Sequence, residues 1–165
     1  MDKFEPIQKP FYDALAEGKF LGRKCSVCGN VEFPAYPLCN KCGNRADEWY
    51  DLTDAEVTVH EVYSIKPAFT IDDYQPYAPV FGCECSMAEG PEFTCLLFGV
   101  TPRNYKEKRD SVPLTGKLVA VPMDGYSTFA VAIDGAVPVR KENGAGTFGS
   151  ANMHDRADAK VKKDE

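Results

Sequence analysis

The stretch CSVCG at residues 25–29 returns as CNKCG at residues 39–43, and this repeat decides how the N-terminal part of the chain folds. Each CxxC pair forms a tight turn whose two sulfurs point the same way, so two pairs can surround one metal ion with four thiolates. A glycine follows each second cysteine, where such a turn often requires a positive φ. The repeat therefore predicts a metal-binding ribbon over residues 20–48. Its ligands are Cys25, Cys28, Cys39 and Cys42.

The predicted ion is a structural zinc, because closed four-cysteine sites are commonly zinc sites and leave no coordination position open to a substrate. Iron uses similar turns and stays open as an alternative from sequence alone. Disulfides are disfavoured, since a cytoplasmic chain seldom keeps them. Four thiolates on a divalent ion carry a formal charge near −2, and four cations stand close enough in sequence to offset it: Arg23, Lys24, Lys41 and Arg45.

Three of the seven cysteines, Cys83, Cys85 and Cys95, lie outside this repeat in alternating apolar segments. Small buried hydrophobic residues on a sheet show this pattern, so we interpret them as core thiols. A nucleophilic cysteine needs a nearby base, and the two histidines of the chain, His60 and His154, lie in no recognisable nucleophile motif.

A short helix is predicted over residues 10–18, with a proline in its first turn and a glycine where it stops. Ile7, Phe11 and Leu15 recur at four-residue intervals and form an apolar stripe. Such a stripe normally covers a core, but a two-turn segment before a small ribbon has little core of its own to cover. Docking of Phe11 and Leu15 on another chain is therefore a second interpretation.

From Trp49 onward the pattern changes to alternating strands rich in Val, Phe, Thr and Cys, with no helical pattern between them. Turn signals at residues 89–91 and 124–125 join the second strand to the third and the fourth to the fifth. Five strands in about 90 residues suit a small OB-type barrel, and sandwich fragments are the alternative. The predicted strands cover residues 56–65, 80–87, 93–100, 116–123 and 128–139.

The predicted fold is thus mainly β: an N-terminal short helix and zinc ribbon at 1–48, a five-stranded OB-fold domain at 49–140, and a flexible Gly-rich, charged tail at 141–165. The tail contains GAGTFG at 144–149, which matches GxGxxG. Only sixteen residues follow it, so no βαβ unit can be completed and the match is spurious.

Two loops interrupt the strands. Residues 66–79 are rich in aromatic side chains and prolines, and long loops of this kind are more often functional than idle. Residues 101–113 hold the dense basic run of the middle domain, which is either a solvated turn or a phosphate contact.

Charge separates the partner classes. Residues 49–139 carry six basic and thirteen acidic side chains, a net charge of −7. Nucleic-acid binding draws most of its affinity from Lys and Arg, so we expect no nucleic-acid partner. No stretch approaches ~18 consecutive apolar residues, which disfavours a membrane span. The N-terminus has no secretory signal pattern, so we expect a cytoplasmic protein without a membrane partner.

The order of helix, CxxCG…CxxCG ribbon and acidic five-strand barrel resembles the zinc-ribbon plus OB-fold family listed as a domain of unknown function, DUF35. The resemblance covers roughly residues 4–139. Its most specific pieces are residues 11–21 leading into 25–29, the second knuckle at 39–43, and Tyr77-Ala78-Pro79-Val80 at the start of the second strand. The ribbon of this family is rubredoxin-like.

The resemblance implies a non-catalytic subunit that binds an acyl-CoA enzyme in a hetero-oligomer. Its expected partner is a thiolase-like large subunit, with a MaoC-type hydratase or a retro-aldolase as alternatives, and a coenzyme A thioester is the ligand of the complex. On this basis Phe69, Tyr77, Arg103 and Lys106 are the residues expected near CoA. The runners-up are an OB-fold nucleic-acid-binding protein and a small independent hydrolase or isomerase.

Overall fold

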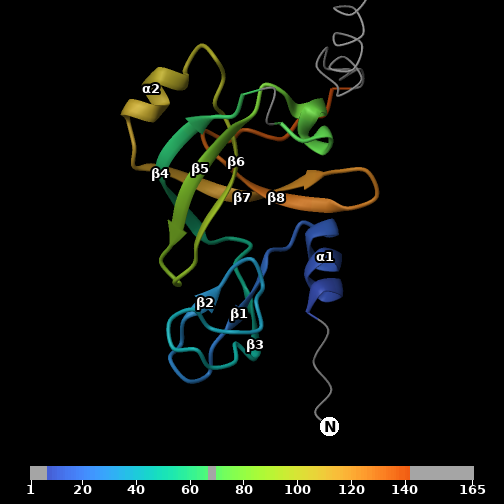
Figure 1. Ribbon diagram of the computed structural model, residues 1–165, viewed down its shortest axis with the longest axis vertical. Helices are drawn as coiled ribbons and strands as arrows, with labels where there is room; N and C mark the ends of the chain where they lie inside the picture. Colours follow the sequence, from blue (N-terminus) through green and yellow to red (C-terminus); the bar gives the residue numbers. More distant parts are fainter. Residues whose placement is uncertain (1–6, 67–69, 142–165) are drawn as a thin grey trace, which may run out of the picture.

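The computed structural model describes residues 7–66 and 70–141. Phe69, His154, the GAGTFG segment and nearly all of the predicted tail lie outside the described residues. The described chain forms an N-terminal helix, a small ribbon and a barrel in that order (Figure 1).

Helix α1 spans Gln8–Ala16 and ends at Gly18, whose φ of 74° stops the helix. The predicted helix is confirmed. One face of it, formed by Phe11, Ala14 and Leu15, is buried, so α1 packs as an amphipathic helix against the rest of the chain.

The ribbon is built on a three-stranded antiparallel sheet with the order β2-β1-β3. Strand β1 is Leu21–Lys24, β2 is Val31–Glu32 and β3 is Glu48–Asp51. Because β3 pairs with β1 along its whole length, Trp49 to Asp51 continue the ribbon sheet rather than begin the barrel. The ribbon sheet therefore runs across the boundary that sequence patterning suggests at residue 48.

Five strands close into a barrel in the order β4-β5-β6-β8-β7, with β7 pairing back to β4. All pairs are antiparallel except β6 with β8, the arrangement of an OB fold. The predicted fold class is confirmed, and the two predicted hairpins turn at Gly90 and Gly125, both with positive φ. The strands are β4 Glu56–Ser64, β5 Phe81–Met87, β6 Glu92–Phe98, β7 Leu114–Pro122 and β8 Ser127–Ala132.

The barrel departs from the sequence-based expectation at three places. Residues 105–110 form a short helix, α2 (Tyr105–Asp110), between β6 and β7, where no helix was expected. Strand β8 ends seven residues earlier than predicted, because Asp134 and Gly135 both have positive φ and turn the chain out of the sheet. Part of the aromatic loop forms a 3-10 helix, η2 (Asp72–Tyr77).

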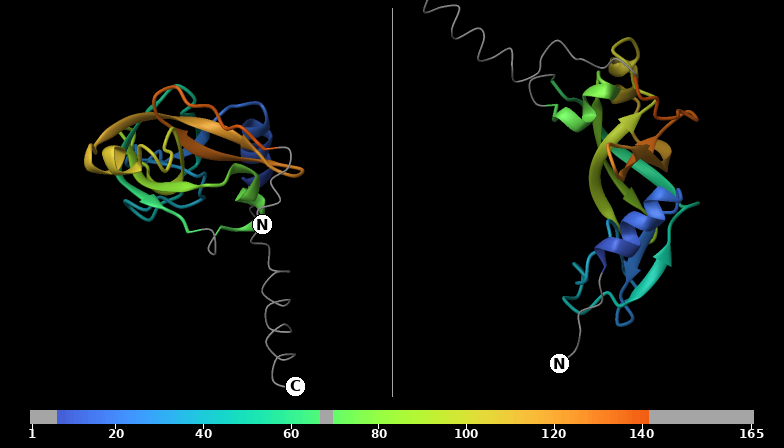
Figure 2. Two further views of the ribbon diagram at one scale, coloured as in Figure 1. Left: turned by 90° about the horizontal axis from the view of Figure 1, so that it is seen from above. Right: turned by 90° about the vertical axis from the view of Figure 1, so that its right-hand side faces the viewer.

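A cluster of phenylalanines joins the helix and the ribbon to the barrel. Phe33 of the ribbon lies 4.8 Å from Phe129 of β8 and 5.3 Å from Phe93 of β6, ring centre to ring centre, and Phe11 of α1 lies 6.0 Å from Phe33. Such edge-to-face pairs add about 0.5–1.5 kcal/mol each to the burial of the rings. The two side views show the ribbon below the barrel and α1 packed along both (Figures 1 and 2). The ribbon and the barrel therefore share one hydrophobic core.

In the part of the chain that the structure describes, no helix has the length and apolar character needed to cross a bilayer.

Candidate metal centre

The two cysteine turns of the ribbon repeat the same backbone hydrogen bonds. The amide of Gly29 donates to the carbonyl of Cys25 at 2.8 Å, and that of Gly43 donates to Cys39 at 2.9 Å. Both glycines have a φ of 75°, as the sequence predicts. The amides of Cys25 and Cys39 in turn bond to the carbonyl oxygens five residues on, those of Asn30 and Asn44. The repeated CxxCGN sequence thus builds two equal knuckles.

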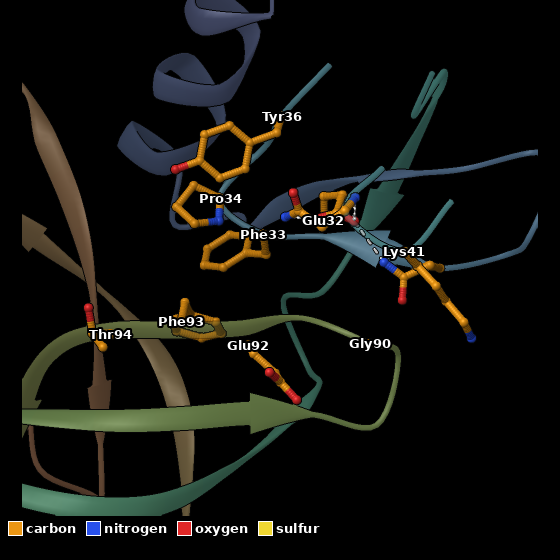
Figure 3. A pocket seen from close by; sticks show the side chains of 11 residues that line it. Glu32, Phe33, Pro34, Tyr36, Lys41, Gly90, Glu92, Phe93 and Thr94 are labelled. Atoms are coloured by element: carbon orange, nitrogen blue, oxygen red, sulfur yellow. Dashed lines mark hydrogen bonds between the residues drawn. The ribbon is translucent and has the colours of Figure 1, made fainter. Parts of the chain in front are cut away.

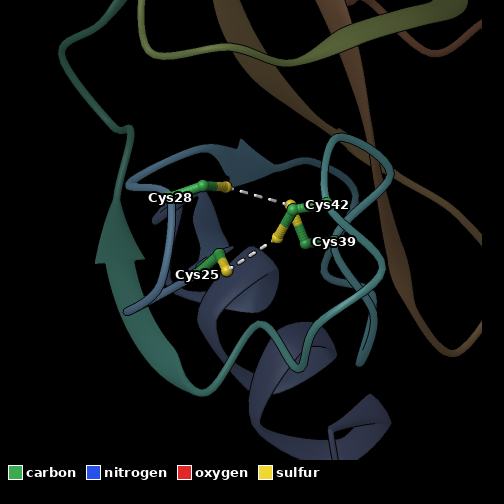
Figure 4. Close-up of side chains that lie close together, drawn as sticks. All are labelled: Cys25, Cys28, Cys39 and Cys42. Carbon is green, nitrogen blue, oxygen red and sulfur yellow. Dashed lines mark hydrogen bonds between the residues drawn. The ribbon is translucent and has the colours of Figure 1, made fainter.

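The four sulfurs of the knuckles converge on one point (Figure 4). Cys25 and Cys42 are 3.6 Å apart, Cys28 and Cys39 are 3.5 Å apart, and all four sulfurs lie within 4.8 Å of one another. A tetrahedral ion with metal–sulfur bonds of about 2.3 Å separates its sulfurs by roughly 3.8 Å. The four cysteines therefore fit one zinc ion, which would be structural because all four positions are filled by the protein.

The Cys42 thiol is the one most clearly set up as a thiolate. Hydrogen bonds from the side chain and backbone of Asn44 lower the pKa of Cys42 to about 6, the Asn44 amide nitrogen lying 3.4 Å from the sulfur. The thiolate is the form that binds a metal, so Asn44 prepares this ligand at neutral pH.

Glu32 of β2 connects the two knuckles from beneath. Its carboxylate accepts hydrogen bonds from the Asn30 side chain at 2.7 Å and from the backbone and side chain of Asn40, both at 2.8 Å. Only 5% of Glu32 is exposed. Asn30 follows the first knuckle and Asn40 lies in the second, so this buried carboxylate fixes the distance between the two pairs of ligands.

The cations near the knuckles have structural contacts of their own. Arg23 is buried, donates to the carbonyl of Ala46 at 3.0 Å and stacks on Trp49 at 4.5 Å. Lys24 lies over the Tyr50 ring. The knuckle is also tied to the chain before β3 by Asp47, whose carboxylate accepts from the Ser26 amide and hydroxyl, and these bonds lower the pKa of Asp47.

The residues predicted to dock on a partner lie inside the molecule instead. Phe11 is 7% exposed and Leu15 is 1% exposed. The second interpretation of the apolar stripe is therefore wrong for these two side chains in this structure. The helix does have a core to cover, because the barrel strand β8 and the ribbon residue Phe33 meet over it.

The described residues predicted to lie near CoA gather at one end of the barrel. Tyr77 is buried, and its hydroxyl donates to the carbonyl of Pro122. It lines an apolar pocket of about 280 Å³ whose wall continues through Thr101 and Pro102. Arg103 follows directly in the chain, and Arg103 and Lys106 are both exposed. Tyr77 and the basic segment therefore meet at one pocket, whereas Phe69 lies outside the described residues.

A larger pocket of about 570 Å³ lies where the ribbon meets the barrel (Figure 3). Phe33 and Phe93 form its apolar floor, and Glu32, Glu92 and Lys41 give it polar walls. Sequence patterning did not single out this pocket, because its residues come from two modules that are distant in sequence.

A histidine and a serine also meet on the outer wall of the barrel. The Nε2 atom of His60 lies 2.6 Å from the Ser86 hydroxyl, where the register between β4 and β5 shifts. Both residues are outside the buried core, and within the described residues no carboxylate holds the other ring nitrogen. The pair therefore lacks the third group that orients the base of a hydrolytic triad.

The comparisons with known proteins agree with this architecture. Residues 13–48 match the family model described as "ChsH2, rubredoxin-like zinc ribbon domain". A protein of Pyrococcus furiosus described as a "DUF35 domain-containing scaffold protein" is 26% identical over 107 residues, which are 65% of this chain and 76% of that protein.

Two solved structures share the fold. One, titled "Ltp2-ChsH2(DUF35) aldolase", has a TM-score of 0.55 at 15% identity and covers 81% of this chain and 98% of its own. The other, a DUF35 protein of Sulfolobus solfataricus with unknown function, has a TM-score of 0.52 at 19% identity and covers 78% and 86%. This chain is a DUF35-type protein. The predicted family is thus confirmed, and the ribbon and barrel are the two parts that DUF35 proteins combine.

Proposed function

We propose that this DUF35-type protein is a non-catalytic, zinc-stabilised accessory subunit of an acyl-CoA-processing enzyme complex. The observation that carries the proposal is the pairing of a closed four-cysteine site with a barrel that holds no complete catalytic group among the described residues. The described relatives support it, since one is named a scaffold protein and another is part of an aldolase complex.

The pocket at Tyr77 is the proposed contact with the CoA thioester. Its lining is mainly apolar and includes Phe98, Val100 and Val139, which suits the pantetheine or acyl chain. Beside it, Lys108 and Arg109 are held by Asp134 and Asp110, while Arg103 and Lys106 form no ion pair within the described residues. These two cations are therefore left for the CoA phosphates.

The partner that we propose is a thiolase. The layout of ribbon, barrel and charged C-terminal segment is similar to the small subunit of benzoylsuccinyl-CoA thiolase in anaerobic toluene degradation. A retro-aldolase is the second candidate, because one structure of the same fold is titled as an aldolase complex. A MaoC-type hydratase partner remains the third.

Affinity purification of the tagged chain from its native cells tests the proposal. We expect an acyl-CoA enzyme to co-purify in a fixed ratio, and its sequence decides between thiolase, retro-aldolase and hydratase. The purified chain alone is expected to be inert toward acyl-CoA. Recovery of the chain as a free monomer, or acyl-CoA turnover by the chain alone, would contradict the accessory role.

A further inference from the structure

Three cysteines that the zinc ribbon does not use meet inside the barrel. Cys83 and Cys85 lie two residues apart on β5, and Cys95 lies directly opposite Cys83 on β6. Residues in these positions share one face of a sheet. All three sulfurs lie within 4.8 Å of one another, and those of Cys83 and Cys95 are 3.8 Å apart. The interpretation as core thiols holds for Cys83 and Cys85, which are buried, but it does not explain why three sulfurs converge.

This spacing fits a three-coordinate metal ion. With metal–sulfur bonds of about 2.3 Å, a planar three-sulfur site separates its sulfurs by roughly 4.0 Å. The separation of Cys83 and Cys95 is already close to this value. Both strands belong to a closed barrel, so the backbone holds the sulfurs near one another before any ion arrives.

The number and type of donors select the ion. Structural zinc takes four ligands, and within the described residues this cluster offers three. Thiolates are soft donors that favour Cu(I), an ion that accepts three-fold coordination. Bound to thiolates, Cu(I) also needs no water in an apolar interior. The cluster therefore suits Cu(I) better than zinc.

A route to the cluster opens on the outer wall of the barrel. Cys85 lines a pocket of about 450 Å³ that is also lined by His60, Glu84 and Glu92. Two carboxylates at the mouth attract a cation, and an imidazole is an intermediate ligand on the way in. Cys95 is itself only partly buried. The cluster is thus near the protein surface on two sides.

We infer that Cys83, Cys85 and Cys95 bind one Cu(I) ion, separately from the zinc of the ribbon. In the metal-free protein the Cys85 thiol donates to the Phe93 carbonyl at 3.2 Å and the Cys83 thiol to the Cys95 carbonyl at 3.8 Å. Binding replaces these contacts with copper–sulfur bonds. Each thiol that becomes a thiolate ligand releases its proton to solvent, and no electron is transferred.

Anaerobic copper titration of the zinc-loaded full chain tests the inference. Cu(I) is presented as its coloured bicinchoninate complex, and both copper uptake and zinc release are measured. We expect one Cu(I) per chain to leave the chelator with the zinc retained. Cys85→Ala should weaken Cu(I) binding by more than about tenfold, a loss that even an outer-shell change can cause.

Met87→Leu is the matched control, because Met87 is a buried sulfur side chain two residues further along the same strand. It should leave copper affinity unchanged. Cys95→Ala serves as a second variant at a less buried position, and Cu(I) should raise the Tm of the wild type but not of either cysteine variant.

Three results would overturn the inference. The first is no copper uptake by the reduced wild type. The second is copper uptake that releases zinc equally in the wild type and Cys85→Ala, because the ion would then occupy the ribbon. The third is a reduced protein that takes up no copper but forms a Cys83–Cys95 disulfide with oxidised glutathione, which would give the pair a redox role instead.

Discussion

At the scale of single residues, Glu32 carries more of the metal site than its place in the sequence suggests. Its buried carboxylate receives hydrogen bonds from Asn30 and Asn40, one from each half of the site. The ligands themselves follow from the CxxC spacing, which is local. The role of Glu32 depends on the pairing of β1 with β2, so the sequence does not show it. The asparagine after each CxxCG is a repeated signal that would have pointed to Asn30 and Asn44.

Replacing Glu32 with Ala should loosen the zinc site. The change leaves the partly buried Asn40 amide without its acceptor, and an unsatisfied buried donor costs about 1–3 kcal/mol. We expect the free energy of unfolding in urea to fall by this amount, and a chelator to remove zinc faster. Glu92→Ala is the control, since Glu92 is exposed at the same pocket. Equal behaviour of the two variants would contradict the bridging role.

Replacing Cys39 with Ser should lower the zinc content of the purified protein, because Cys39 is a buried member of the four-sulfur group. Amide hydrogen exchange should become faster over residues 20–48, since a structural zinc contributes folding free energy. Cys83→Ser removes a thiol from the barrel and should leave the zinc content unchanged. Metal analysis of both proteins decides this, and zinc that followed Cys83 would overturn the assignment.

At the scale of elements, alternation predicts strands well and short polar helices poorly. The barrel strands β4 and β5 are found within a residue of their expected bounds, because their buried positions alternate regularly. Helix α2 has the sequence YKEKRD and no buried residue, so it has no apolar stripe to reveal it. Strand β3 was assigned to the wrong sheet because alternation shows a strand but not its partner.

Helix α1 tests the packing at this scale. Leu15 is almost fully buried, so Leu15→Ala should lower the free energy of unfolding by about 2–5 kcal/mol. Lys9→Ala changes an exposed position of the same helix and should shift it by less than about 0.5 kcal/mol. Both values come from urea unfolding of the zinc-loaded protein. If Leu15→Ala kept full stability and instead lost a partner, the helix would be a docking element.

At the scale of the whole molecule, charge opposes the nucleic-acid function that OB folds often serve. The barrel region, residues 49–139, carries a net charge of −7 and repels phosphate backbones. We expect single-stranded oligonucleotides to bind no more tightly than roughly 10⁻⁴ M at physiological salt, the weak end of non-specific affinity. Fluorescence anisotropy measures this. Submicromolar binding that weakened steeply with added salt would favour the nucleic-acid alternative.

The central claim is that this chain acts only through a larger enzyme. The most direct measurement is the acyl-CoA turnover of the co-purifying enzyme, separated from this chain and then titrated with it. The account predicts low turnover without the chain and a rise that saturates at a fixed molar ratio. It also predicts that the double variant R103A/K106A raises KM more than it lowers kcat, because phosphate contacts are lost equally from the ground and transition states. An isolated large subunit that is fully active, and indifferent to added chain, would contradict the account.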